Sequence, residues 1–381
     1  MKILVTGGCG FIGSHTTVEL LKNGYEVIVV DNLSNSNNKV AEKIKKITGR
    51  EIIFHQIDLC DKEALEEVFE KYDDISAVFH FAGNRIEDES IGEPLKYYRN
   101  NLDTTLTLLE VMKEYGCKKI IFSSSSAVYG NPEKLPIPES ADLRVITPFG
   151  QTKLACENIL RDIYAVEDGW SIALLRYFNP AGANEMGLLG EKQCDQPNNL
   201  IPVIIKIAQG EQDELKVYGD TYNTPDGTTI RDYIHVSDLA KAHIKILEKV
   251  LSTKDIDVYN LGTGRGYSVL DVVRAFERVN NIKIPYQVVD RKSDEVPEIY
   301  ADITYAENKL GWHPEKNLED MCRDAYNFAV EHKKEEAAER EAEAKRLEEE
   351  RIAEEKRKEE ERLEEERKKA ELEEIETLET E

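Results

Sequence analysis

Apolar residues in the first half of the chain alternate between short continuous runs and longer stretches with helical spacing. The short runs are typical of buried strands: Lys2 to Thr6, Glu26 to Val30, Ile52 to Gln56, Ala77 to Phe81, Lys119 to Ser123 and Ile172 to Arg176. Helical spacing covers the stretches between them: Ser14 to Asn23, Lys62 to Lys71, Leu102 to Tyr115 and Thr152 to Val166. Such alternation predicts an α/β fold, a doubly wound parallel sheet with helices on both faces.

The pattern changes after Phe178. Loop-rich segments such as NPAGANEMG and YGDTYNTPDG separate shorter elements, up to a final helix predicted over Leu318 to Glu331. We expect these elements to form a smaller, interleaved C-terminal substrate-binding lobe. Three parts follow: a first domain over residues 1–178, the lobe over 179–332, and a charged tail over 333–381.

The tail is almost entirely Glu, Lys, Arg and Ala, with 13 basic and 22 acidic residues. Acid and base stand four residues apart, acid first, in four pairs: Glu336 with Arg340, Glu341 with Lys345, Glu354 with Lys358 and Glu364 with Lys368. This order stabilises a helix. Leucine and isoleucine do not repeat at coiled-coil positions. We predict a solvated, partly frayed single helix, on the order of 70 Å long when fully formed. It serves as a solubilising tail, or as a spacer or docking segment for an unknown partner.

The glycines after the first strand form a loop of a specialised kind. Gly7, Gly10 and Gly13 lie between the first strand and the first helix, and Asp31 follows the second strand. Glycines allow a tight turn, a close approach of a pyrophosphate and close helix packing, while the helix N-terminus offers N–H groups to phosphates. A carboxylate at this spacing accepts hydrogen bonds from the adenosine ribose. The sequence therefore predicts a Rossmann-type first domain that binds NAD rather than NADP.

Composition excludes several classes of protein. The formal net charge is −25, of which the tail carries −9, so no basic excess supports nucleic-acid binding. The six cysteines contain no C-x-x-C pair and the seven histidines show no metal-ligand spacing, so we expect a reducing compartment and no metal. The chain begins with its first strand, without a signal peptide or an apolar run of membrane-spanning length. We expect a cytoplasmic location and no membrane association.

Several motifs together resemble the UDP-glucose 4-epimerase family of extended short-chain dehydrogenase/reductases. They are TGGCGFIGSH, DNLSNS, HFAG, FSSSSAVYG, LLRYFNPAGA, NNLIP, RDYIHVSDLA and YNLGTGRGYSVLDVV, in order over about residues 1–330. Related sugar-nucleotide 4,6-dehydratases carry an Asp-Glu pair where this chain has Ser126 and Ala127. The resemblance implies a tightly held NAD, a 4-keto sugar intermediate, a UDP-sugar substrate and a homodimer formed through the helices at Leu102 to Tyr115 and Thr152 to Val166.

The resemblance also implies a set of cofactor-binding residues. They are Gly7, Gly10, Phe11, Ile12, Gly13, Asp31, Asn32, Asn35, Ser36, Asp58, Leu59, Phe81, Ala82, Gly83, Arg85, Asn100, Lys153 and Phe178. Arg85 stands where many relatives have lysine.

The catalytic positions implied by the resemblance are Ser125, Phe149 and Lys153. The family uses a Tyr-x-x-x-Lys pair, in which the phenolate takes the proton of the sugar 4-hydroxyl and the lysine lowers the phenol pKa. Phe149 occupies the tyrosine position in TPFGQTK and has no ionisable oxygen. General acid/base catalysis through this side chain is lost, a contribution typically of about 10² to 10⁴ in rate.

The resemblance implies substrate contacts mostly in the second lobe, with Ser125 in the first domain. They are Ser125, Asn179, Asn199, Leu200, Tyr218, Arg231, Lys292 and Glu295. RKSDE replaces the usual Arg-Arg-x-Gly-Asp, so Lys292 meets the diphosphate as a point charge and Glu295 reaches one methylene further than aspartate. We expect weakened UDP-sugar binding.

Several of the candidate site residues also have an ordinary structural explanation. The serines at Ser123 to Ser126 are typical of a turn, Lys153 of a helix surface, Arg231 and Asp232 of a surface ion pair, Asn198 and Asn199 of a helix cap, and Phe149 of a core aromatic. Two function classes stay open. One is a slow epimerase in which Ser125 passes the proton through a water to Tyr129 or Tyr177, and the other is a non-catalytic NAD and UDP-sugar binder or scaffold.

Overall fold

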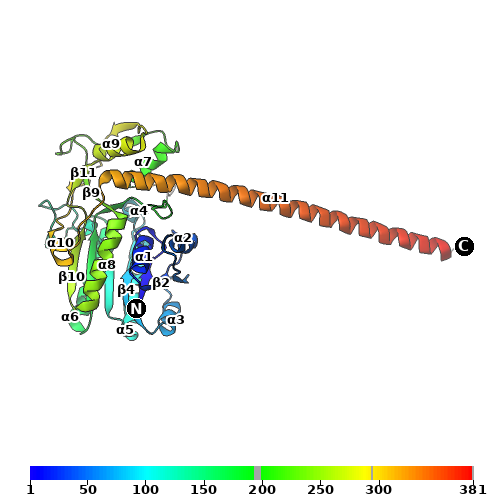
Figure 1. Ribbon diagram of the computed structural model, residues 1–381, viewed down its shortest axis with the longest axis horizontal. Coiled ribbons are helices and arrows are strands. Elements are labelled where there is room, and N and C mark those ends of the chain that lie inside the picture. Colours follow the sequence, from blue (N-terminus) through cyan, green and yellow to red (C-terminus); the bar gives the residue numbers. More distant parts are fainter. Residues whose placement is uncertain (193–198, 293–294, 380–381) are drawn as a thin grey trace. The chain divides into compact units, whose positions relative to one another are not determined.

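The computed structural model describes residues 1–192, 199–292 and 295–379, with side chains as far as residue 370. Its main sheet has seven parallel strands in the order β10-β6-β5-β4-β1-β2-β3 (Figure 1). Their bounds are β1 Lys2–Thr6, β2 Glu26–Val30, β3 Ile53–His55, β4 Ile75–His80, β5 Lys119–Ser125, β6 Ser171–Tyr177 and β10 Ile256–Leu261. The predicted doubly wound parallel sheet is confirmed.

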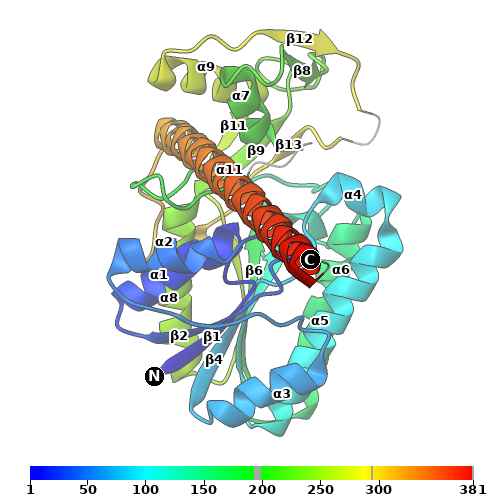
Figure 2. The same ribbon diagram turned by 90° about the vertical axis from the view of Figure 1, so that its right-hand side faces the viewer.

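Helices cover both faces of this sheet (Figure 2). One face packs against α1 Phe11–Lys22, α2 Lys39–Thr48 and α8 Val236–Ser252; the other packs against α3 Lys62–Lys71, α5 Pro94–Glu114 and α6 Pro148–Val166. Because successive side chains of a strand point to opposite faces, Ile3 and Val5 join the first core and Leu4 joins the second. This double burial explains why these strands are continuous apolar runs.

A smaller set of elements forms the second lobe. A four-stranded sheet contains β7 Asn179–Ala181, β9 Ile230–His235, β11 Gly266–Ser268 and β13 Glu298–Ile299, and a two-stranded sheet pairs β8 Leu215–Tyr218 with β12 Tyr286–Val289. The lobe's helices are α7 Leu200–Ala208 and α9 Val269–Asn280; α4 Glu87–Gly92, the 3-10 turn Ser126–Val128 and α10 Thr304–Leu310 lie elsewhere in the fold. The lobe is interleaved, since the chain returns from it to the first sheet through α8 and β10.

Three helices begin earlier than the apolar spacing predicts: α1 at Phe11 rather than Ser14, and two more by a larger margin. α5 starts at Pro94 rather than Leu102, and α6 starts at Pro148 rather than Thr152. Both have proline in the first helical turn, where its missing N–H costs no hydrogen bond. Thr147 caps α6 by accepting the N–H of Gly150 at 3.3 Å. The early start of α6 brings Phe149 into the helix, one turn before Lys153.

The last helix, α11 Leu318–Glu379, is continuous, whereas the sequence predicts separate helices on either side of residue 332. The chain divides into two compact units, Met1–Ala329 and Val330–Glu381, which are described separately. In the second unit, three of the predicted pairs form: Glu336 with Arg340, Glu354 with Lys358 and Glu364 with Lys368. Lys345 pairs with Glu349 instead of Glu341.

Side chains from Glu336 to Ala370 are exposed, which confirms a solvated single helix. Within the described ranges, no helix is both long enough and apolar enough to cross a membrane.

Candidate active site

The glycine loop between β1 and α1 has the close geometry that its sequence predicts. Gly7 has a positive φ of 66°, and its N–H donates to the carbonyl of Val30 at 2.8 Å. A Cβ on Gly13 would lie 2.3 Å from the carbonyl oxygen of Gly7. The first-turn N–H groups of α1, at Phe11 and Ile12, have no partner within the helix by construction. This narrow loop and its free donors suit the pyrophosphate of a dinucleotide.

Asp31 connects the glycine loop to the loop after β2. Its buried carboxylate accepts the N–H groups of Cys9 and Leu33, both at 2.9 Å, and the hydroxyl of Ser36 at 3.1 Å. The sequence did not indicate this structural role. A carboxylate has further acceptor sites beside these three bonds, so contact with a ribose stays a prediction.

A second carboxylate lies at the end of β3. Asp58 accepts the N–H of Cys60 and the side-chain amide of Asn32, both at 2.9 Å. The backbone bond from Cys60 holds the pKa of Asp58 below its usual value, although burial opposes the shift. Asn35 and Leu59 lie in the same two loops.

The loop after β4 carries Phe81, Ala82, Gly83 and Arg85. It is anchored by Asn84, whose N–H donates to the side-chain oxygens of Asn100 at 3.0 Å and Asn101 at 2.7 Å. Asn101 is buried, and its amide nitrogen also donates to Thr152 on α6 at 2.9 Å. Sequence reasoning named Asn100 but missed Asn101, which lies on a buried helix face that also carries Thr104 and Thr105.

The three catalytic candidates lie where β5 meets α6. Ser125 ends β5, and its Oγ accepts the N–H of Ala127 at 3.2 Å. Gly150 packs against this turn, since a Cβ there would lie 2.9 Å from the carbonyl oxygen of Ala127. Phe149 is buried in the first turn of α6. Gly150 therefore lets the first turn of α6 approach the turn that follows Ser125.

Lys153 is enclosed by apolar surroundings. Its Nζ donates to the carbonyl of Ser123 at 2.7 Å, and it lies 5.1 Å from the ring centroid of Phe122 and 5.9 Å from that of Phe149. Burial disfavours the charged form and lowers the pKa of Lys153 to about 8. This lysine is therefore not the ordinary helix-surface residue that the sequence left open.

The relay from Ser125 through Tyr129 or Tyr177 receives no support from the structure. The Tyr129 hydroxyl donates to Asn260 at 2.6 Å and accepts from Arg176 at 3.0 Å, and burial raises its pKa to about 12. The Tyr177 hydroxyl lies 2.7 Å from Nε2 of His243, and burial raises the pKa of Tyr177 well above its usual value. Both hydroxyls belong to buried structural networks.

Three substrate candidates line one cavity in the second lobe. Asn179 comes from β7, Asn199 stands at the N-cap position of α7 without a side-chain capping bond, and Leu200 begins the helix; the cavity is also lined by Glu191, Tyr233 and Phe328. Phe178 precedes Asn179 and is buried. Sequence reasoning missed Glu191, Tyr233 and Phe328. Tyr233 stands inside the RDYIHV motif, which was a usable signal, while nothing local marks the other two.

The other substrate candidates form two pairs, none of whose members lines this cavity. Arg231 lies 3.3 Å from Glu295, and Nζ of Lys292 lies 4.9 Å from the ring centroid of Tyr218. Arg231 thus pairs with Glu295 in place of the surface pair with Asp232, whose carboxylate accepts the N–H groups of Thr263, Gly264 and Ala301. Asn198 and Cys194 lie outside the described residues.

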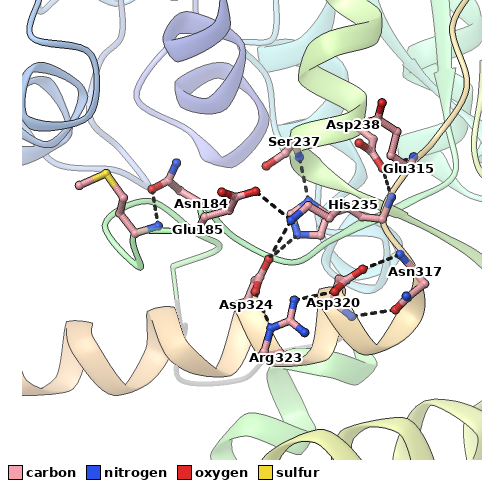
Figure 3. A network of polar contacts seen from close by, with 12 residues as sticks. Asn184, Glu185, His235, Ser237, Asp238, Glu315, Asn317, Asp320, Arg323 and Asp324 are labelled. Carbon is pink, nitrogen blue, oxygen red and sulfur yellow. Dashed lines mark hydrogen bonds and ion pairs between the residues drawn. The ribbon is translucent and has the colours of Figure 1, made fainter.

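A polar network holds the first turns of α11 against the second lobe (Figure 3). Nδ1 of His235 accepts the N–H of Ser237 at 3.1 Å, so Nε2 carries the proton and lies 3.2 Å from Asp324. Burial opposes ionisation of Asp324, but His235 and Arg323 hold its pKa below the usual value. Gly182, which follows β7, lies close against the imidazole, since a Cβ there would lie 2.6 Å from Nε2. Gly182 and Phe328 both line the cavity, so the network lies directly behind part of its lining.

Two features limit the chemistry of the site. In the part of the chain that the structure covers, no three His, Cys, Asp or Glu side chains gather as a metal site. The structure brings buried Lys153 together with the Phe149 ring at the junction of β5 and α6, where Ser125 ends the strand. Such a set can bind and orient a polyhydroxylated ligand, but its phenyl ring cannot carry a proton.

Comparison with known proteins places the chain in a family. A model of the NAD dependent epimerase/dehydratase family matches residues 3–262, and the chain belongs to this family. The family description confirms the predicted cofactor. Among curated relatives, UDP-glucose 4-epimerase of Bacillus subtilis is 51% identical over 328 residues, which are 86% of this chain and 96% of the relative. UDP-glucose 4-epimerase of Dictyostelium discoideum is 48% identical over 328 residues, which are 86% of this chain and 95% of the relative. The resemblance to UDP-glucose 4-epimerases is confirmed.

Solved structures agree with this assignment. UDP-glucose 4-epimerase from Bifidobacterium longum, in complex with NAD+ and UDP, has a TM-score of 0.83 and 47% identity, covering 87% of this chain and 98% of that one. The enzyme from Stenotrophomonas maltophila, with NAD and formylated UDP-arabinopyranose, has a TM-score of 0.86 and 40% identity, covering 88% and 99%. These matches confirm the predicted fold class.

Proposed function

We propose that this protein binds NAD at the glycine loop and a UDP-sugar in the second lobe, and that it interconverts UDP-glucose and UDP-galactose at a rate lowered by Phe149. The observation that carries the proposal is the buried Lys153, with its lowered pKa, in a chain that retains Ser125 and is half identical to a UDP-glucose 4-epimerase. The phenyl ring of Phe149 stands one helical turn from that lysine.

The fit of the cofactor is supported by the loop itself. A dinucleotide supplies a hydride acceptor and donor when bound. Gly7, Gly10 and Gly13 keep side chains away from its pyrophosphate, the first turn of α1 offers N–H donors, and Asp31 lies at the end of β2 to meet the ribose. The roles of Phe81, Ala82, Gly83, Arg85, Asn100 and Phe178 are part of the same proposal.

The chain's own groups have distinct tasks toward the sugar. Ser125 hydrogen-bonds the 4-hydroxyl oxygen, and the positive charge of Lys153 stabilises negative charge that develops on it. Asn179, Asn199 and Leu200 hold the nucleotide, together with Tyr218, Arg231, Lys292 and Glu295. Phe149 keeps the packing of the family's aromatic ring but provides no oxygen, so the proton must leave by a slower route.

The test is turnover of UDP-galactose to UDP-glucose by the protein and its Phe149→Tyr variant at equal NAD content. Restoring the phenol is expected to raise turnover by about 10² or more, because general acid/base catalysis contributes that much. Lys153→Met in the Phe149→Tyr background is the control, and the gain is expected to disappear there.

Equal, appreciable rates in both proteins would mean that another residue carries the proton. An absence of turnover in both, with UDP binding retained, would favour the second candidate, a non-catalytic NAD and UDP-sugar binder. The observation favouring this second candidate is Phe149 itself.

Assembly and organisation belong to the same proposal. We infer a homodimer through α5 and α6, where Leu95, Leu106 and Val166 are exposed at 79, 43 and 86%. Exposed apolar side chains indicate an interface where they form a contiguous patch, so the inference rests mainly on the resemblance. The boundaries near residues 178 and 332, the cytoplasmic location and an unknown partner for the charged helix remain proposals. Sedimentation equilibrium of the protein and a Leu106→Glu variant tests the dimer.

A further inference from the structure

One carboxylate oxygen joins segments from the two halves of the site. Oε1 of Glu191 lies 3.0 Å from NH1 of Arg85 and 3.2 Å from Nδ2 of Asn199. Arg85 follows β4 in the NAD-side half, whereas Asn199 precedes α7 in the second lobe. The three side chains are about a hundred residues apart in sequence at their furthest, so the contact is a product of the fold.

The environment of Glu191 differs from that of a surface ion pair. Its side chain is only 14% exposed and lines the cavity beside Asn179 and Leu200. A hydrogen bond to an ionised acceptor is shorter and stronger than a neutral one, and a shielded site screens it less. The Arg85–Glu191 contact is therefore better placed to fix geometry than an exposed pair such as Lys316–Glu185, whose acid is 71% exposed.

Each partner of Glu191 keeps groups that can meet a ligand. Arg85 has five N–H donors and is half exposed, so its other donors can reach a phosphate. The nitrogen of the Asn199 amide is committed to Glu191, which leaves its oxygen as an acceptor for a ligand in the cavity. Glu191 thereby sets both the position of the guanidinium and the orientation of the amide.

We propose that Glu191 is a positioning residue that couples Arg85 to Asn199 and thereby strengthens binding of the uridine diphosphate group. The inference rests on the proposed function, since it takes UDP as the occupant of the cavity. A phosphate oxygen that binds Arg85 steadies the guanidinium against Glu191, and Glu191 in turn holds the amide at the N-terminus of α7. A ligand that spans both halves gains from this rigid bridge, because less side-chain freedom is lost on binding.

The test is a double-mutant cycle on UDP affinity, measured by isothermal titration calorimetry on the full-length protein with its NAD. The variants are Glu191→Gln, Arg85→Gln and the double variant; Glu185→Gln is the matched control, which removes an acid from an exposed pair. Each single site variant is expected to weaken UDP binding about fivefold, and the double variant no more than about fivefold, because the two residues act through one contact. All titrations are made with saturating NAD, because Arg85 is also a proposed cofactor contact. NAD content is expected to be unchanged in Glu191→Gln and Glu185→Gln, and Tm is expected to be unchanged in all four variants.

The outcomes separate the inference from the function on which it rests. If the double variant weakens UDP binding by the product of the two single effects, or if Glu191→Gln binds UDP as tightly as the starting protein, the proposed coupling is wrong. The proposed UDP binding would still hold. If the starting protein itself binds no UDP, the proposed function fails and the inference falls with it. If Glu191→Gln has a lower NAD content or a lower Tm, the Glu191→Asp variant is measured as well. A normal Tm with UDP affinity still weakened supports the positioning role, whereas a normal Tm with normal UDP affinity contradicts it.

Discussion

At the scale of single residues, the loss of one oxygen at Phe149 changes the surroundings of Lys153. Its ammonium lies among a backbone carbonyl and the rings of Phe122 and Phe149, and its pKa is lowered to about 8 by burial. In a site with a phenol, that charge would have an acidic partner. Here the pKa of Lys153 lies within about one pH unit of neutral. Its deprotonation can therefore be followed through the pH dependence of the free energy of unfolding.

We predict that Lys153 makes folding stability rise between about pH 8 and 10.5. Over this window the unfolded chain still holds the lysine proton, whereas the folded chain has released it, so the unfolded state binds more protons and stability rises with pH. A shift from 10.5 to about 8 corresponds to about 3 kcal/mol. The check is the free energy of unfolding by urea at pH 7.5 to 10, in the protein and in Lys153→Met.

The difference between the two proteins isolates this lysine, because other groups that titrate in the range cancel. Lys153→Met is expected to lack the rise, and Lys216→Met, at an exposed strand position, is expected to keep it. Identical pH profiles for all three proteins would contradict a buried, shifted lysine.

At the scale of elements, apolar runs predict the strands well because both faces of the sheet are buried. β6 extends one residue beyond the predicted run at each end, and α3 has the predicted bounds. The starts of α5 and α6 were missed, since TPFG resembles a loop until proline is recognised as a first-turn residue. The continuity of α11 was missed because composition changes near residue 333 while helix propensity does not.

The candidate site was predictable only where a motif is local. The glycine loop, Ser125 and Lys153 could be placed from short motifs in the sequence. Glu191, Tyr233 and Phe328 share a cavity although up to 137 residues separate the first and last of them, and no spacing rule joins such positions. The structural bonds of Asp31 were also invisible, because they depend on how two loops fold over one carboxylate.

For the glycine loop as an element, we predict that Gly13→Ala destabilises the fold and removes bound NAD. The new methyl would lie 2.3 Å from the Gly7 carbonyl oxygen, a backbone atom that cannot turn aside, so α1 must move away from β1. Overpacking of this kind costs about 1 to 3 kcal/mol. Tm and NAD content of the purified protein are the measurements. Gly92→Ala is the control, because a Cβ there meets open space. Normal NAD content in Gly13→Ala would mean that the loop is not the dinucleotide site.

At the scale of the whole molecule, the chain joins two units stabilised by different forces. Met1–Ala329 has buried apolar cores on both faces of its sheet, whereas the helix of Val330–Glu381 is stabilised along its own surface by pairs such as Arg351 with Glu348 and Glu355. Buried cores unfold cooperatively. A single helix loses its ends gradually, and its exposed ion pairs are screened by salt.

We therefore predict that truncation after His332 leaves the cooperative unfolding of the body and its NAD content unchanged but removes a gradual, salt-sensitive loss of helix. In the full chain, circular dichroism at 222 nm should fall steadily on heating before the cooperative step, and this slope should steepen at 1 M NaCl, where the Debye length is about 3 Å. The truncated protein should show the cooperative step alone, at the same Tm and with little response to salt before it. A Tm lowered by truncation would instead show that the charged helix stabilises the body, which would favour a docked segment over an independent spacer.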